Sequence, residues 1–200
     1  MEKIMGISEY DTKAHLIQNN YLIVDEFISK EETESLHAAF KAEAAANPDK
    51  YVIDPEGTKS IGIYNFIPFV QLLVDKVPVI KSIVKEDVLP TNCYARLYKH
   101  GAELPKHADR TACEISVTLH LGSDGTEWPI YFTDPRGTQV EIKLKPGQAA
   151  VYLGIQSVHW RNKFEGQQYA QVFLHYVRTY GENSEHYFDS VAKNPIRIQP

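Results

Sequence analysis

The tripeptide His107-Ala108-Asp109 places two potential metal ligands two residues apart. Side chains of an extended chain alternate between two faces, so this imidazole and this carboxylate are expected to point the same way. A further imidazole, His159, begins a β-type run fifty residues after Asp109. Two imidazoles and one carboxylate on one face of an octahedron are typical of non-haem iron(II) sites, which keep positions open for a co-substrate and O2.

A series of short β-type runs is expected to position these ligands. The runs begin after Thr91 and cover residues 92–99, 113–121, 129–133, 138–144, 148–153, 159–163 and 169–178. Turn-forming residues separate them, as in Gly122-Ser123-Asp124-Gly125. Seven short strands predict an antiparallel double-stranded β-helix, or jelly roll, in which a late strand can bring His159 back to the first pair of ligands.

The N-terminal part has a different, mainly helical pattern. After an apolar run at 21–27, Ser29 and Glu32 fit a helix capping box, which predicts a helix over 30–46. A second helical region is expected over 66–84, interrupted by Pro78. We therefore expect one mixed, mainly β domain over residues 1–200. Its parts are a helical layer with supporting strands over about 1–88, a β-roll core over 91–178 and a tail over 181–200.

Charge and composition favour a cytoplasmic protein with a small partner molecule. The formal net charge of -5 gives no general basic field, so nucleic acid is not expected as a partner. No run approaches the ~20 apolar residues that cross a bilayer, so no membrane partner is expected either. Cys93 and Cys113 are expected to be reduced, buried residues. None of these patterns indicates an oligomeric state.

The segment Tyr98-x-x-Gly101-x-x-Leu104-x-x-His107-x-Asp109 resembles the iron(II)/2-oxoglutarate-dependent dioxygenases, in particular their prolyl 4-hydroxylase-like branch. Further similarity lies in YLIVDEFISKEETESL, GTEWPIYF, LKPGQAAVYLG and VHWR, so the resemblance covers residues 20–178. It implies Fe(II), 2-oxoglutarate and O2 as cofactor and co-substrates. It also implies hydroxylation of an unactivated C–H bond in a prolyl residue, an amino acid or a similar small-molecule or peptidyl substrate, with release of succinate and CO2.

The sequence departs from this family at the cation that holds the far carboxylate of 2-oxoglutarate. Relatives usually place an Arg or Lys about ten residues after the distal histidine, but residues 167–171 read QQYAQ. Arg161 is our expected replacement, because it lies two residues after His159 and so faces the same interior. Arg96 is the alternative, since it shares a strand face with Tyr94 and Tyr98, and it could instead contact the substrate.

The resemblance assigns other positions around the site. Tyr98 and His120 match positions that contact 2-oxoglutarate, although relatives usually have tyrosine at the second. We expect Ser116, Thr118 and Asn162 to hydrogen-bond around the metal ligands. His175 is expected either inside the roll near the co-substrate or outside it beneath the helices. The histidines at 15, 37, 100 and 186 are assigned no role.

A competing interpretation is a non-catalytic β-roll module that binds zinc or no metal at the same three residues, because zinc also accepts two histidines and a carboxylate. An inward Arg161 favours the enzyme, since a simple metal-binding module has no use for a buried cation. Substrate choice is expected to depend on the loops at 51–67 and 109–113 and on the tail after Tyr180.

Overall fold

The computed structural model describes residues 11–47, 52–53 and 58–189. Predictions for the first ten residues, for part of the 51–67 loop and for the tail beyond Asp189 lie outside these ranges.

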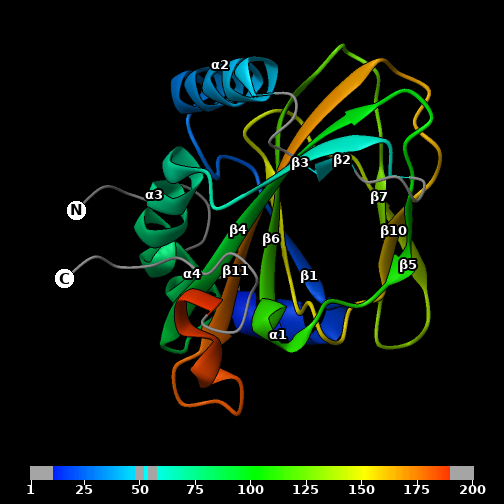
Figure 1. The fold of residues 1–200 in the computed structure, drawn as a ribbon. Coiled ribbons are helices and arrows are strands. Elements are labelled where there is room, and N and C mark those ends of the chain that lie inside the picture. Colours follow the sequence, from blue (N-terminus) through cyan, green and yellow to red (C-terminus); the bar gives the residue numbers. More distant parts are fainter. Residues whose placement is uncertain (1–10, 48–51, 54–57, 190–200) are drawn as a thin grey trace.

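Two antiparallel sheets face each other and form the body of the molecule (Figure 1). The seven-stranded sheet has the order β1-β9-β6-β11-β4-β3-β2, and the four-stranded sheet has the order β5-β10-β7-β8. The strands are β1 (Tyr21–Val24), β2 (Val52–Ile53), β3 (Ser60–Tyr64), β4 (Val88–Lys99), β5 (Leu104–His107), β6 (Ile115–Ser123), β7 (Ile130–Thr133), β8 (Gln139–Ile142), β9 (Ala149–Tyr152), β10 (His159–Arg161) and β11 (Gln168–Arg178).

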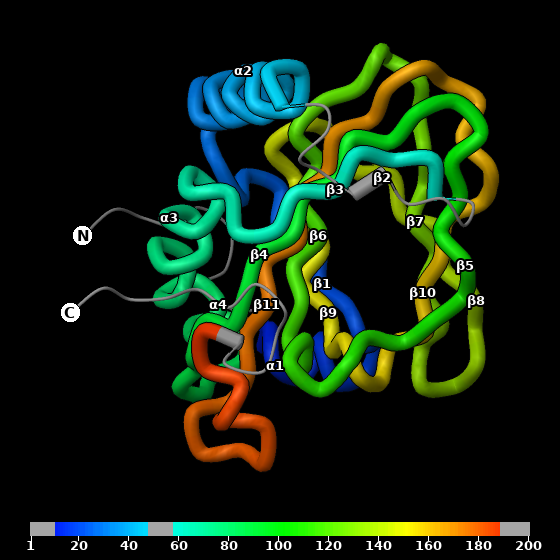
Figure 2. Tube along the Cα trace, in the orientation of Figure 1, coloured from blue at the N-terminus to red at the C-terminus, as the bar shows by residue number. Residues whose placement is uncertain are grey.

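The chain crosses repeatedly between the two sheets. It leaves the larger sheet after β4, β6 and β9, enters the smaller sheet at β5, β7 and β10, and returns at β6, β9 and β11. Figure 2 shows these crossings along the Cα trace. This alternation is the winding of a jelly roll, so the predicted fold class is confirmed.

Helices cover the outer face of the larger sheet. They are α1 (Thr12–Asn19), α2 (Lys30–Ala46), α3 (Ile67–Asp75) and α4 (Val77–Val84), with 3-10 turns at Thr111–Cys113 and Ser184–Asp189. The predicted cap is confirmed, because the Ser29 hydroxyl accepts a hydrogen bond from the backbone N–H of Glu32 at 3.1 Å.

The predicted helical region over 66–84 is confirmed as two helices. The break lies at Lys76 instead of at Pro78, which is in the first turn of α4. Proline is tolerated there because the first turn of a helix needs no N–H donor at that position.

The main core lies between the helices and the larger sheet. Phe40 of α2, Phe69 of α3 and Ile80 of α4 are fully buried in one cluster with Val117 and Val172 from the sheet. Burial of these apolar side chains provides most of the favourable free energy that holds the layers together. Cys93 and Cys113 are buried and form no disulfide, as predicted.

The space between the two sheets contains two smaller aromatic clusters. Phe132 and Tyr152 belong to one, while Tyr98, Trp128 and Tyr169 belong to the other. These packed rings form rigid walls for the side chains that point into the roll.

Candidate metal centre

Strand pairing in the smaller sheet brings two imidazoles together. His107 at the end of β5 and His159 at the start of β10 are register partners in the antiparallel pair. Their ring centroids lie 4.3 Å apart. Two residues distant in the sequence therefore become neighbours on the inner side of one sheet.

Asp109 joins them from the loop after β5. Its backbone N–H donates to the carbonyl oxygen of Gly154 at 2.9 Å, which fixes the loop against the segment after β9. Its Oδ1 lies 3.7 Å from Nε2 of His107 and 3.7 Å from Nε2 of His159. One ligand atom from each of the three residues falls within 4.8 Å of the others, so the predicted ligands converge.

Hydrogen bonds fix which imidazole nitrogens face this point. Nδ1 of His107 lies 2.8 Å from the carbonyl oxygen of Pro105, and Nδ1 of His159 lies 2.9 Å from that of Ser157. A carbonyl oxygen can only accept, so each neutral ring carries its hydrogen on Nδ1 and keeps a lone pair on Nε2. Both Nε2 atoms are thus available as metal ligands.

A serine and a further histidine support the carboxylate. The Ser116 hydroxyl lies 2.7 Å from Oδ2 of Asp109, and its oxygen also lies 2.9 Å from Nδ1 of His175. Oδ2 is therefore occupied by a protein contact while Oδ1 faces the two imidazoles. His175 points into the roll, which resolves the two orientations left open by the sequence.

Gly154 is a site residue that the sequence reasoning missed. A Cβ at this position would lie 2.0 Å from the carbonyl oxygen of Cys113 and 2.7 Å from Oδ2 of Asp109. Only glycine lets the backbone pass this close to the carboxylate. Its position directly after the apolar run of β9 was a usable signal.

Burial controls the protonation of the groups around the centre. It lowers the pKa of His159, although the neighbouring Asp109 carboxylate acts in the opposite direction. Burial also raises the pKa of Tyr152 well above its usual value, and the nearby Asp109 adds to this effect. At neutral pH the site therefore presents a neutral His159 and a neutral phenol beside the carboxylate.

A cavity of about 280 Å³ opens beside the three ligands. Besides them, it is lined by Tyr64, Asn92, Tyr94, Arg96, Tyr98, Leu104, Ala108, Arg110, Cys113, Tyr152, Phe173 and His175. Arg96 donates to the Ser60 hydroxyl at 2.9 Å, and its guanidinium lies 5.0 Å from the Tyr94 ring centroid. Tyr94, Arg96 and Tyr98 of β4 therefore all face this cavity, as predicted.

Arg161 is buried in the roll with only 2% of its surface exposed. Its guanidinium lies 4.8 Å from the Trp128 ring centroid and 5.0 Å from that of Tyr169. Nη1 donates to the carbonyl oxygen of Trp128, and Nη2 donates to Oε1 of Gln171 at 2.9 Å. The Arg161 side chain therefore points into the roll, as expected, but it does not line the cavity at the metal ligands.

Thr118 and Asn162, which were expected around the metal ligands, lie apart from them. Thr118 is fully buried and accepts a hydrogen bond from Gln171, so it supports the Arg161 side chain through that residue. The expected role of Asn162 beside the metal was wrong, because Asn162 is exposed. It lies three residues after His159, which places it on the opposite strand face.

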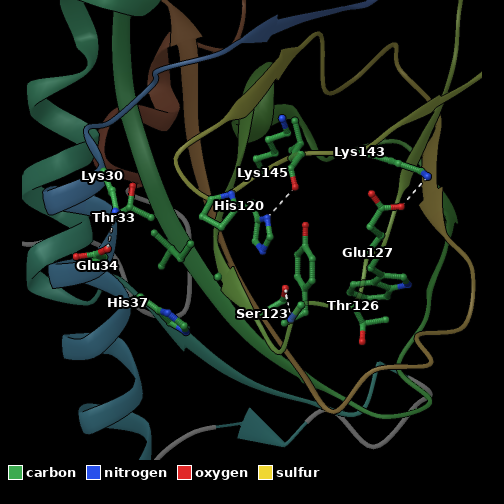
Figure 3. Close-up of a pocket in the computed structure, with 17 residues that line it drawn as sticks. Lys30, Thr33, Glu34, His37, His120, Ser123, Thr126, Glu127, Lys143 and Lys145 are labelled. Atoms are coloured by element: carbon green, nitrogen blue, oxygen red, sulfur yellow. Dashed lines mark hydrogen bonds and ion pairs between the residues drawn. The ribbon is translucent and has the colours of Figure 1, made fainter.

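The position of His120 also differs from the expectation. It is buried against Tyr169 and lines a second cavity instead of the one at the metal ligands (Figure 3). A contact between His120 and a co-substrate bound at the metal is therefore not retained.

Known proteins are similar to this chain in structure but do not match it by sequence. No protein-family model matches the chain, and no curated protein matches it by sequence. Solved structures do match. A prolyl-4-hydroxylase from Pseudomonas putida aligns with a TM-score of 0.69 and 15% identity, over 84% of this chain and 97% of the other.

Two further structures contain 2-oxoglutarate. EctD from S. alaskensis, with 2-oxoglutarate and 5-hydroxyectoine, aligns with a TM-score of 0.70 and 14% identity, over 90% of this chain and 79% of that one. HygX from Streptomyces hygroscopicus, with nickel and 2-oxoglutarate, has a TM-score of 0.67 and 10% identity, over 84% and 86%.

The chain has the fold of the 2-oxoglutarate oxygenases. The fold that the sequence motif implied is therefore confirmed. Among the described residues, no helix is both long enough and apolar enough to cross a membrane.

Proposed function

We propose that this protein is an iron(II)- and 2-oxoglutarate-dependent oxygenase that hydroxylates an unactivated C–H bond and releases succinate and CO2. The observation that carries the proposal is the convergence of His107, Asp109 and His159 within 4.8 Å, beside a cavity. The fold shared with 2-oxoglutarate-binding enzymes supports it independently.

The donor set fits iron(II). Two neutral imidazole nitrogens and one carboxylate oxygen form the ligand combination that non-haem iron(II) oxygenases use. When bound, the iron would supply the activation of O2 and the oxidative decarboxylation of 2-oxoglutarate. The residues of this chain orient the ligands, since each Nδ1–H is bound to a backbone carbonyl and Oδ2 of Asp109 accepts from Ser116.

Arg161 is our proposed partner for the far carboxylate of 2-oxoglutarate. A buried guanidinium keeps its charge and needs an anion, yet its two observed acceptors, the Trp128 carbonyl and the Gln171 amide, are neutral. Among the described residues no carboxylate lies within ion-pair distance of Arg161. Tyr98 links the two regions, because it lines the metal cavity and its ring centroid lies 4.8 Å from that of Trp128.

Arg96 is the alternative partner and has one advantage, since it lines the metal cavity directly. It is however less buried than Arg161 and already donates to the Ser60 hydroxyl. We therefore assign Arg96 to the substrate and Arg161 to the co-substrate.

For the prime substrate we propose a prolyl residue, an amino acid or a similarly small molecule. A cavity of about 280 Å³ is slightly smaller than the usual range of about 300–1,000 Å³ for small-molecule sites, which favours a small reacting group. The similar structures include a prolyl-4-hydroxylase, EctD with 5-hydroxyectoine and HygX with hygromycin B. Those ligands belong to those proteins, and their diversity justifies a broad panel.

The test is succinate formation from 2-oxoglutarate under air, with iron(II) added to metal-free protein and a panel of free amino acids and proline-containing peptides. We expect iron-dependent release of succinate and CO2 that increases with one class of substrate. Tight zinc binding together with no iron-dependent turnover across the panel would instead support the non-catalytic module.

A further inference from the structure

A second cavity of about 540 Å³ lies away from the metal ligands. It is bounded by α2, the end of β6, the loop at 123–128, the segment at 143–146 and Tyr169 (Figure 3). None of the three metal ligands lines it. Its volume is within the usual range of about 300–1,000 Å³ for small-molecule sites.

His120 carries the main polar feature of this cavity. It is only 4% exposed, and its ring stacks on Tyr169 with centroids 4.1 Å apart and planes 7° apart. Nδ1 lies 2.8 Å from the carbonyl oxygen of Leu144, so Nδ1 carries the ring hydrogen and donates it. The other nitrogen, Nε2, is then a hydrogen-bond acceptor.

This acceptor has no hydrogen-bond partner among the residues that the structure describes. In Figure 3 it lies on the side of the His120 ring away from the dashed hydrogen bond, toward the part of the cavity where His37 and Ser123 lie. Burial lowers the pKa of His120 to about 4, so the ring stays neutral near pH 7 and Nε2 keeps its lone pair. Buried polar atoms in folded proteins are nearly always satisfied, so this one calls for a partner.

The remaining lining selects the type of partner. The rings of Trp128 and Tyr169, together with the side chains of Leu121, Leu144 and Pro146, provide apolar walls. Four of the five charged side chains that line the cavity form two pairs, Lys143 with Glu127 at 2.7 Å and Lys30 with Glu34 at 3.9 Å. Two imidazole nitrogens that line this cavity have no partner among the described residues, Nε2 of His120 and Nε2 of His37. Only His120 is buried as a whole residue and has its ring hydrogen fixed on Nδ1, so its Nε2 is the acceptor that a largely apolar molecule with a single donor fits.

We propose that this cavity is a binding site for a small uncharged molecule, with an apolar ring or chain and one O–H or N–H that donates to Nε2 of His120. The site is separate from the metal centre and does not depend on the proposed oxygenase activity. It is therefore testable on metal-free protein.

Phenol and toluene are matched probes, because they have the same shape and only phenol has a donor. The Trp160→Phe variant leaves Trp128 as the single indole of the chain, so its fluorescence reports on the cavity wall. Toluene is the more apolar probe and would bind more tightly if no acceptor were present. We expect both probes to change Trp128 fluorescence, with phenol at least as tight as toluene.

The His120→Phe substitution keeps a ring against Tyr169 but removes the acceptor. In that background we expect the ratio of phenol to toluene affinity to fall about three- to tenfold, the effect of one net hydrogen bond. His37→Phe is the matched control, since His37 also lines the cavity with a buried, unpartnered Nε2, and it should leave the ratio unchanged. If His37→Phe lowers the ratio and His120→Phe does not, the assignment of the acceptor is wrong.

A second measurement needs no substitution of His120. In the long-range ¹H–¹⁵N spectrum of the imidazole rings, phenol should shift the Nε2 signal of His120 in the direction of an accepted hydrogen bond, and toluene should not. The absence of any response to either probe, in fluorescence and in this spectrum, would overturn the proposed site.

Discussion

His107 and His159 are register partners in the antiparallel pair of β5 and β10, with ring centroids 4.3 Å apart. The metal centre is therefore built on a backbone hydrogen-bonded pair, and the third ligand comes from the loop that follows β5. Because two ligands are fixed by strand register, the position of Asp109 is the part of the site most open to perturbation.

Gly154→Ala should weaken iron(II) binding strongly. The added Cβ would overlap the Cys113 carbonyl oxygen and would lie 2.7 Å from Oδ2 of Asp109, so the carboxylate must move. We expect at least about a tenfold loss of iron affinity, of the size seen when groups that support metal ligands are removed. Competition with a fluorescent iron chelator measures this affinity directly.

The matched control is Gly125→Ala. Gly125 has φ of +95° and no atom within 4 Å of an added Cβ, so the change strains the backbone without touching the site. It should lower the free energy of unfolding by about 1 kcal/mol and leave iron affinity unchanged. Equal iron affinity in the Gly154→Ala variant and the wild type would contradict the role assigned to Gly154.

Ser116→Ala should reduce iron affinity by about 10- to 100-fold while the fold persists. The hydroxyl holds Oδ2 of Asp109 at 2.7 Å, and without it the carboxylate gains rotational freedom. Isothermal titration with iron(II) under nitrogen measures the loss. Ser116→Thr, which keeps the hydroxyl, should restore part of the affinity, whereas the same weak binding in both variants would point to packing as the cause.

Arg161→Gln should raise the concentration of 2-oxoglutarate required for half-maximal turnover by about a hundredfold or more. Removing one partner of a buried charge pair costs about 2–5 kcal/mol. Arg96→Gln is the control and should change the apparent affinity for the prime substrate instead. The reverse result would transfer the co-substrate role to Arg96.

Stability should decline in acid in a way that depends on His120. Its pKa in the folded protein is about 4, below the value of 6.5 for an unburied histidine. A lowered histidine pKa gives stability that is fully present above pH 6.5 and is lost as the pH falls through the folded value. From pH 7 to pH 4 this amounts to about 3 kcal/mol of unfolding free energy.

His120→Phe should remove this part of the pH dependence. Urea unfolding at pH 7 and pH 4 should therefore show a decrease that is about 3 kcal/mol smaller in the variant than in the wild type. His15, His37 and His159 also have lowered pKa values and remain in both proteins, so they cancel in this comparison. Identical decreases in the two proteins would show that His120 is not protonated on unfolding in this range.

Much of the fold followed from local patterns. The helix over 30–46 was marked by its cap at Ser29, and the alternation of His159 and Arg161 placed both inside the roll. The same alternation should have excluded Asn162, because it lies three residues after His159 and one after Arg161, on the opposite face of the strand. That mistake was avoidable from the sequence.

Other features depend on contacts between distant segments and have no local signal. The convergence of Asp109 requires a loop held by Gly154, and the position of His120 depends on a change of register between β6 and β11 near Ala170 and Gln171. Short strands such as β3 and β5 were also not predicted, because each forms only by pairing with a longer or more apolar neighbour.

The most direct test of the central claim is the anaerobic addition of iron(II) and 2-oxoglutarate to metal-free protein, followed by visible absorption. We predict the weak charge-transfer band of an iron–2-oxoglutarate chelate in the wild type. We predict no band in Asp109→Ala, which loses a charged ligand but should keep its far-ultraviolet circular dichroism. No band in the wild type, or the same band in Asp109→Ala, would contradict a centre formed by His107, Asp109 and His159.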